Sequence, residues 1–164
     1  MEVEGFVPRR ATTLVEEALA DTRVVLVMGA RQTGKSTLLD EVARRRWGKA
    51  VLTLDDAATR AAAANDPTGF VADLETPVAI DEAQRAPDLL LAIKQRVDQD
   101  QRPGQFLLSG SSNLMSNRRI KDALTGRIEI IDLRPLSLAE LHATKTSLVD
   151  RLFAQDIPQV TDAP

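Results

Sequence analysis

The sequence predicts an α/β protein of three layers, with helices on both faces of a mostly parallel sheet. Apolar runs of strand length alternate along the chain with segments whose apolar residues repeat at helical spacing. The first strong run, Val24 to Met28, is continuously apolar and rich in valine, as a strand buried on both faces is. The chain has 164 residues, which is enough for one domain with its own core. We therefore expect a single layered domain.

Composition narrows the class of protein. Apolar residues make up 43% and charged residues 27%, as in ordinary globular proteins, and the net charge of −3 gives no general attraction to nucleic acid. The chain has no cysteine and one histidine, His142, which argues against disulfides, thiolate or histidine metal sites and a Ser-His triad. The first ten residues do not resemble a signal peptide, and no run approaches membrane-spanning length. The expected location is cytoplasmic.

The loop after the first strand carries the strongest motif. Its residues, with the one that follows, are Gly29, Ala30, Arg31, Gln32, Thr33, Gly34, Lys35, Ser36 and Thr37. They match G-x-x-x-x-G-K-[ST], in which backbone N–H groups and a helix N-terminus bind phosphates. We expect Lys35 to reach the β- and γ-phosphates and Ser36 to bind Mg²⁺. The alternative is a glycine turn that merely joins a strand to a helix.

Helices are expected on both sides of this loop. The segment before the first strand has Leu14, Val15, Ala18 and Leu19 on one side, capped by Thr12 or Thr13. We expect it to pack on the sheet edge; the alternative is that it walls an adenine pocket. After the loop, a helix is expected to end with three arginines, 44–46, and Gly48, because cations suit a helix C-terminus. Nucleic-acid contact is the alternative for these arginines, and packing is expected for Trp47.

The middle of the chain predicts a strand and two short helices. Residues 50–54 read as the second strand, and Asp55 or Asp56 is expected to cap the alanine-rich helix that follows, through Ala64. The sequence Asn-Asp-Pro at 65–67 ends that helix. Residues 68–74 then predict a short helix with Phe70 and Val71 directed inward.

A second informative motif is PVAIDEAQ, at residues 77–84. Its apolar part predicts a short strand over residues 78–80, so that Asp81 and Glu82 lie at the carboxyl end, where ligands bind in open α/β sheets. We expect Asp81 to hold Mg²⁺ through water and Glu82 to act as the general base for an attacking water. The alternative is that both carboxylates only cap the next helix.

The remaining segments complete the alternating pattern. We expect a helix over 87–97, a strand over 105–108 followed by small polar residues at 109–113, a helix over 116–124 and a strand over 128–133. Arg127 precedes the last strand and either neutralises charge on the γ-phosphate or is a surface arginine. A capped helix is expected over 137–142. Residues 143–164, with a short amphipathic stripe and a proline-containing tail, are expected to fray outside the domain of residues 1–142.

The order of these motifs resembles the AAA-type ATPases, whose fold is the three-layer, AAA/RecA-like P-loop NTPase fold. More narrowly, the chain is similar to a prokaryotic AAA family with a G-x-R-Q-x-G-K-[ST] loop. The matching stretches, which span about residues 7 to 142, are GARQTGKS at 29–36, DD at 55–56, DP at 66–67, DEAQ at 81–84, QFLLSGSS at 105–112, LTGR at 124–127 and PLS at 135–137 before Glu140.

The resemblance implies ATP and Mg²⁺ as ligands and a five-stranded sheet in which the strand of Phe106 lies between those of the loop and Asp81. It further implies that Ser112 or Asn113 is the sensor residue and that Arg127 is the family's arginine. Many relatives continue into a nuclease-like domain, whereas this chain stops at Pro164, so a truncated gene, an expressed fragment or an ATPase-only form is expected, in each case without that domain.

Other functions remain open at this stage. The main alternative is a non-hydrolysing, nucleotide-dependent binding module. A helicase core would need a second motor domain, and a small-molecule kinase would need a lid, for which Arg118 and Arg119 are candidates. No adenine- or guanine-reading motif is visible, so ATP and GTP are not separated. Nucleotide is the expected partner, a weak homo-oligomer is open, and nothing points directly to a membrane or to nucleic acid.

Overall fold

A computed structural model describes residues 7–111, 114, 118–137 and 140. Arg10–Pro135 form one compact unit, and the second unit contains Met1–Arg9 and Leu136–Pro164. Within the second unit, the N–H of Ser137 donates to Oε2 of Glu140 at 2.9 Å, and the N–H of Glu140 donates to Oγ of Ser137 at 3.2 Å. This reciprocal pair is a capping box, as a helix start at Ser137 requires. Residues 141–164 lie outside the described residues, so the domain boundary at 142 and the fraying tail stay predictions.

The larger unit contains a five-stranded sheet in the order β2-β3-β4-β1-β5, in which every pairing is parallel. The strands are β1 (Val24–Met28), β2 (Leu52–Thr53), β3 (Val78–Asp81), β4 (Phe106–Gly110) and β5 (Ile128–Asp132). The predicted α/β class is confirmed. The strand of Phe106 lies between the loop strand β1 and the Asp81 strand β3, as the family resemblance implies.

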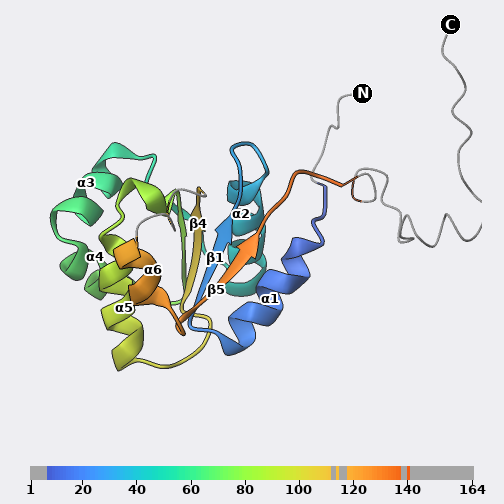
Figure 1. Cartoon of the computed structure of the whole chain (residues 1–164). Coiled ribbons are helices and arrows are strands. Elements are labelled where there is room, and N and C mark those ends of the chain that lie inside the picture. The colour runs from blue at the N-terminus through green and yellow to red at the C-terminus, as the bar shows by residue number, and fades with distance from the viewer. Residues whose placement is uncertain (1–6, 112–113, 115–117, 138–139, 141–164) are drawn as a thin grey trace, which may run out of the picture. The chain divides into compact units, whose positions relative to one another are not determined.

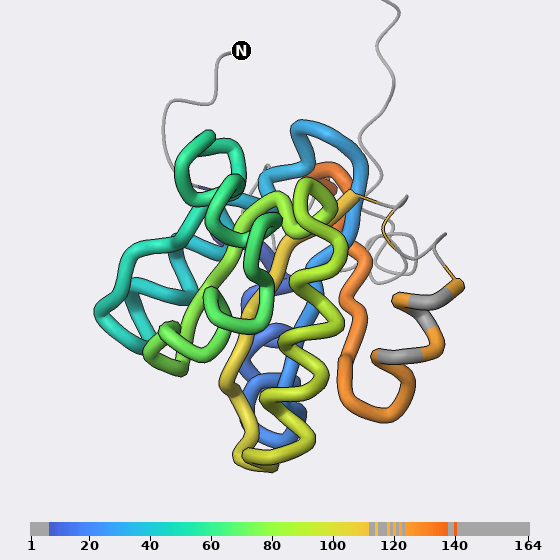
Figure 2. The backbone as a smooth tube through the Cα atoms, turned by 90° about the vertical axis from the view of Figure 1, so that its left-hand side faces the viewer, coloured from blue at the N-terminus to red at the C-terminus, as the bar shows by residue number. Residues whose placement is uncertain are grey.

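Helices cover both faces of the sheet (Figure 1). They are α1 (Ala11–Asp21), α2 (Lys35–Trp47), α3 (Ala57–Asn65), α4 (Pro67–Asp73), the 3₁₀ turn η1 (Ala83–Arg85), α5 (Leu89–Gln99) and α6 (Arg118–Leu124). Helices α1 and α2 lie on one face, and α3 to α6 lie on the other. Figure 2 views the molecule from the side of α3, α4 and α5, and α5 runs along the sheet. The three predicted layers are therefore present.

Two hydrophobic cores result from the alternation of side chains along each strand. Val25 and Val27 of β1 pack with residues of α1 and α2, whereas Val24 and Leu26 pack with residues of α3 to α6. All four valine and leucine side chains are fully buried. This explains why β1 reads as an uninterrupted apolar run rather than an alternating one.

The first helix differs from its prediction in two respects. It follows Arg10 and has no side-chain cap, so the expected capping role of Thr12 or Thr13 is wrong. Thr12 is instead buried, and its hydroxyl donates to Glu41 of α2 at 3.4 Å. Val15 and Leu19 are buried as expected, but Leu14 is 55% exposed, because α1 rests on the sheet along a narrower stripe than the sequence suggested.

Acidic residues set the starts of the two short helices. Asp56 caps α3 through a 2.8 Å bond from the N–H of Thr59, as predicted, and Asp66 caps α4 through a 2.9 Å bond from the N–H of Gly69. Helix α4 therefore begins at Pro67, one residue earlier than predicted, since proline suits the first turn of a helix. Strand β2 is shorter than residues 50–54, because only two of its residues pair with β3.

The ends of other elements also moved. Strand β4 extends through Gly110, so Ser109 belongs to the strand and not to a polar loop after it, because its register continues along β1. Helix α5 begins at Leu89 after η1, two residues later than predicted. The end of α2 agrees with the sequence, since Gly48 is left-handed at φ 65° and Trp47 packs partly buried. Among the described helices, none combines the length and the apolar character that crossing a bilayer requires.

Candidate functional site

The loop between β1 and α2 is shaped for an anion. Gln32 and Gly34 have positive φ values of 62° and 89°, which turn successive backbone N–H groups inward. The Thr33 hydroxyl donates to the Ala30 carbonyl at 2.9 Å and fastens the turn. No side chain caps the first turn of α2. Its N–H groups are therefore left for a bound anion at the positive end of the helix.

Gly29 is required at the start of the loop for a steric reason. A Cβ there would lie 2.4 Å from the carbonyl oxygen of Leu133, which follows β5. This approach is fixed, because the N–H of Leu133 donates to the carbonyl of Met28 at 2.6 Å. The residue after β5 thus packs against the start of the loop. Any residue larger than glycine at position 29 would displace either Leu133 or the loop.

Lys35 is the first residue of α2 and only 7% exposed. Its ammonium group donates to the carbonyls of Gly29 at 3.2 Å and Ala30 at 2.8 Å, so it lies across the loop. Ser36 and Thr37, next in the helix, are exposed. A hydroxyl at this point is a suitable oxygen ligand for a metal ion bound to phosphates.

The predicted acidic pair lies at the carboxyl end of β3, close to the end of β4. Asp81 is 7% exposed and accepts a hydrogen bond from the hydroxyl of Ser109 in the neighbouring strand. The same hydroxyl accepts from the N–H of Glu82 at 3.0 Å. Glu82 has a left-handed backbone, with φ 61°, which turns the chain out of the strand. One serine therefore fixes both acidic residues.

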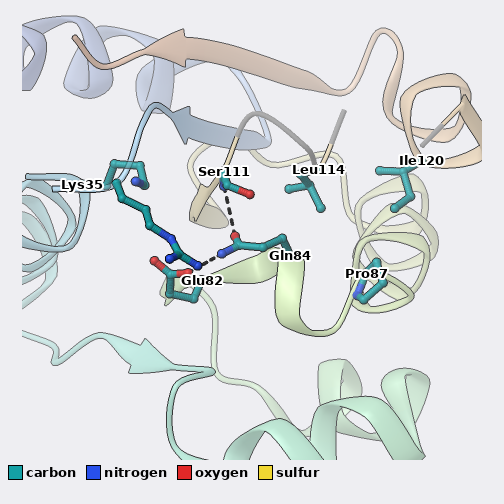
Figure 3. A pocket seen from close by; sticks show the side chains of 8 residues that line it. Lys35, Glu82, Gln84, Pro87, Ser111, Leu114 and Ile120 are labelled. Carbon is teal, nitrogen blue, oxygen red and sulfur yellow. Dashed lines mark hydrogen bonds between the residues drawn. The ribbon is translucent and has the colours of Figure 1, made fainter. Parts of the chain in front are cut away.

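Gln84 connects Glu82 to the end of β4 (Figure 3). Its Nε2 donates to Oε2 of Glu82, and its Oε1 accepts from the N–H of Ser111 at 3.1 Å. Sequence reasoning assigned no role to Gln84. It treated Ser109 only as one of the small polar residues at 109–113, which either orient water or a γ-phosphate or form a capped turn, and not as the partner of Asp81. The only available signal for them was their place within the DEAQ and LLSGSS motifs.

Two adjoining cavities bring the loop and Glu82 together. A cavity of about 620 Å³ is lined by Arg31, Gln32, Gly34, Lys35, Ser36, Thr37, Asp55, Glu82 and Arg85. A second, of about 600 Å³, shares Arg31, Lys35 and Glu82 and is lined further by Gln84, Pro87, Ser111, Leu114 and Ile120. Each volume is in the range of small-molecule sites. Asp55 and Arg85, which were not assigned to the site, form an ion pair within the first cavity.

This arrangement fits a nucleotide with Mg²⁺. The uncapped turn of α2 offers N–H donors, Lys35 offers a cation, and Ser36 offers an oxygen ligand of the kind that Mg²⁺ prefers. Asp81, at the end of β3, does not line either cavity and is the residue next to Glu82, which does. Gly29 has the tight backbone contact that would not accommodate a side chain.

Arg127 lies at the end of the sheet opposite to the loop, where the parallel strands begin. It precedes β5, whose first residue Ile128 pairs with Val24 at the start of β1, whereas the loop follows the end of β1. Figure 1 shows the start of β5 and the loop at opposite ends of the sheet. Its guanidinium pairs with Asp98 and lowers the pKa of that carboxyl, with Lys94 adding to the effect. The structure does not bring Arg127 to its own chain's site, and Asn113 lies outside the described residues.

Comparison with known proteins gives two relatives, both uncharacterized. The protein Rv2008c of Mycobacterium tuberculosis and the protein Mb2031c of Mycobacterium bovis are each 34% identical to this chain over 151 residues. The match covers 88% of this chain and 32% of either relative, so the chain spans about a third of their length. The model of a family described as "AAA domain" matches residues 21–142. That range includes the loop, the acidic pair and all five strands, and the chain belongs to the AAA domain family, which implies that it binds a nucleotide.

Proposed function

We propose that this chain is an ATPase domain that hydrolyses ATP in a Mg²⁺-dependent reaction. The observation that supports the proposal most is that Glu82 lines the same cavity as Lys35 and Ser36. A module that only bound nucleotide would need the loop and the lysine, but it would not need a carboxylate beside them. The G-x-R-Q-x-G-K-[ST] and DEAQ motifs support the narrower prokaryotic AAA subtype.

Each residue of the site has a role in this proposal. The N–H groups at the start of α2 hold the phosphate chain, and Lys35 exchanges its loop carbonyls for the β- and γ-phosphates. Ser36 and Asp81 would hold Mg²⁺, which supplies positive charge to the phosphate oxygens when bound. Glu82 accepts a proton from the attacking water. The oxygen of that water bonds to the γ-phosphorus as the bond to ADP breaks and ADP leaves.

The remaining parts of the proposal rest on the sequence. The proposed nucleotide is ATP rather than GTP, because the AAA family implies ATP. A cytoplasmic location stays a prediction. So does the non-hydrolysing alternative, which the test below separates from the proposal.

The first test is nucleotide-dependent stabilisation. At about 100 times its Kd, a ligand stabilises a fold by about 2.7 kcal/mol, which in a domain of this size raises Tm by about 5–10 °C. We expect this rise with Mg·ATP in the wild type and its loss in Lys35→Ala, each measured against the same variant without nucleotide. Lys49→Ala removes a lysine just beyond the far end of α2 and should keep the full rise. An equal rise in Lys35→Ala would place the nucleotide elsewhere.

The same preparations test hydrolysis. Glu82→Gln should keep the Tm rise while single-turnover hydrolysis falls by about 10²–10⁴-fold, because the substitution removes the base but retains the side-chain shape. Phosphate release under excess enzyme measures this step. A wild type that binds ATP without releasing phosphate would support the binding module, and a Glu82→Gln variant with the wild-type rate would contradict the assignment of the base.

A further inference from the structure

The backbone and the side chain of Glu82 are each held by a hydrogen bond that nucleotide binding does not require. Its backbone N–H donates to Ser109 at 3.0 Å, which fixes the main chain at the end of β3. That bond leaves the rotamers of the side chain undetermined. A carboxylate that activates water must point at one position, and an error of about 1 Å in placement is costly in rate. Something else must therefore fix the carboxylate.

Gln84 supplies that constraint. Its side-chain amide donates to Oε2 of Glu82, and no donor to Oε1 is found among the described residues. One carboxylate oxygen is thus occupied by an orienting donor, and the other is left to accept a proton. An amide is suited to this, since it carries no charge that would compete with phosphate.

The amide is itself oriented from the neighbouring strand. Oε1 of Gln84 accepts from the N–H of Ser111 at 3.1 Å, directly after β4. With its oxygen held there, the nitrogen of the amide can only face Glu82, as Figure 3 shows. Gln84 is half-buried and lies in the short turn η1, which begins one residue after Glu82.

We infer that Gln84 is a positioning residue, which orients the Glu82 carboxylate and ties it to the end of β4 through Ser111. The inference rests on the proposed hydrolytic function, because it gives Gln84 a role only through Glu82. A movement of the chain after β4 would reach the base by way of this amide. Gln84 lines the second cavity, and the inference gives it a role through Glu82 rather than through the phosphates.

Two substitutions separate the two hydrogen bonds. Gln84→Glu keeps an acceptor for the N–H of Ser111 but loses the donor to Glu82, and Gln84→Met keeps the length of the side chain but loses both. In both variants single-turnover hydrolysis should fall by about 10–100-fold, the range seen when an orienting partner of a functional group is removed. The Kd for Mg·ATP should stay within about threefold in Gln84→Met, whereas Gln84→Glu adds a negative charge near the phosphate site and is compared by its rate at saturating Mg·ATP. Gln95→Met, on the exposed side of α5, is the matched control.

A readout without hydrolysis tests the bond to Ser111. Amide hydrogen exchange at Ser111 should be faster in Gln84→Met than in wild type and unchanged in Gln84→Glu. Unchanged exchange in Gln84→Met would show that the bond is absent in solution and would overturn the inference.

A double variant tests whether Gln84 acts through Glu82. Gln84→Met should have no further effect on the rate in a Glu82→Gln background, because residues that act as a unit are not additive. A full additional loss in the double variant, a parallel loss of affinity in Gln84→Met, or a wild-type rate in Gln84→Glu would each overturn the inference while leaving the proposed function intact. A wild type that binds but never hydrolyses ATP would overturn the proposed function, and the positioning role with it.

Discussion

At the scale of single residues, the site depends on close contacts that tolerate little change. Glycine is needed at position 29 because of a carbonyl oxygen that follows β5, more than 100 residues later in the chain. The pattern in the sequence predicts that this glycine lies against phosphate, but it cannot predict contact with Leu133. Ser109 and Gln84 are similar cases, since Asp81 lies on the strand beside that of Ser109, and Ser111, the partner of Gln84, directly follows β4.

A substitution of Gly29 tests this contact. In Gly29→Ala the added Cβ overlaps a backbone oxygen, and overpacking of this kind typically costs about 1–3 kcal/mol. We expect a lower Tm without any nucleotide and a weaker rise with Mg·ATP. In Gly126→Ala the Cβ would meet nothing within 4 Å but φ is 75°, so this variant measures backbone strain without overlap, whereas Gly29, which has no positive φ, measures overlap without that strain. A Gly29→Ala variant with the stability of wild type would mean that β5 moves aside freely.

At the scale of elements, the type and order of the strands and helices followed from the sequence, and their ends did not. The apolar runs located all five strands, and the clearest of them are β1, β3 and β4, which are buried on both faces. The number of residues that pair in β2 and β4 depends on the neighbouring strand, which no local pattern records. Caps were predictable where the side chain had one local partner, as at Asp56, and not at α1, where tertiary packing with Glu41 engages Thr12.

The cap of α3 predicts a dependence of stability on pH. Hydrogen bonds from the backbone and then the side chain of Thr59 lower the pKa of Asp56 below its ordinary value of 3.8. A lowered pKa in the folded state means that the stabilisation is complete above the unfolded pKa and is lost as pH falls through the folded one. Asp56→Asn keeps a cap that does not titrate.

We therefore expect the Tm of wild type, relative to that of Asp56→Asn, to be constant from pH 7 to about pH 5 and to fall below about pH 4. Thermal melts of the two proteins in matched buffers measure the difference. Parallel curves down to pH 2.5 would show that the capping bond contributes nothing in solution.

At the scale of the whole molecule, the sheet separates two groups that the sequence left together. Arg127 lies where the parallel strands begin and the loop lies where they end. The two are about 16 Å apart, since five strand residues rise about 3.3 Å each. The alternative that Arg127 serves its own site is thus disfavoured, and a role in a neighbouring copy stays a prediction. The match of this chain to a third of each relative leaves open what the remaining length contributes.

A dependence on protein concentration tests that role. If Arg127 completes the site of another copy, the ATPase rate per molecule should rise with concentration, since such an arginine contributes about 10³–10⁵ in rate. Arg127→Ala should abolish the rise and leave the affinity for Mg·ATP unchanged. Arg23 lies just before β1 at the same end of the sheet, and Arg23→Ala should behave as wild type. A wild-type rate in Arg127→Ala at every concentration would make Arg127 a surface residue.

The left-handed backbone of Glu82 sets stability against activity at the same residue. A side chain in this conformation costs about 1–2 kcal/mol that glycine avoids, although glycine gives back part of it through its freer unfolded chain. We therefore expect Glu82→Gly to have a higher Tm than Glu82→Gln. The difference corresponds to up to about 1 kcal/mol in the free energy of unfolding, while hydrolysis is lost in both variants. Stability and the proposed use of the carboxylate therefore make opposite demands on the residue at position 82.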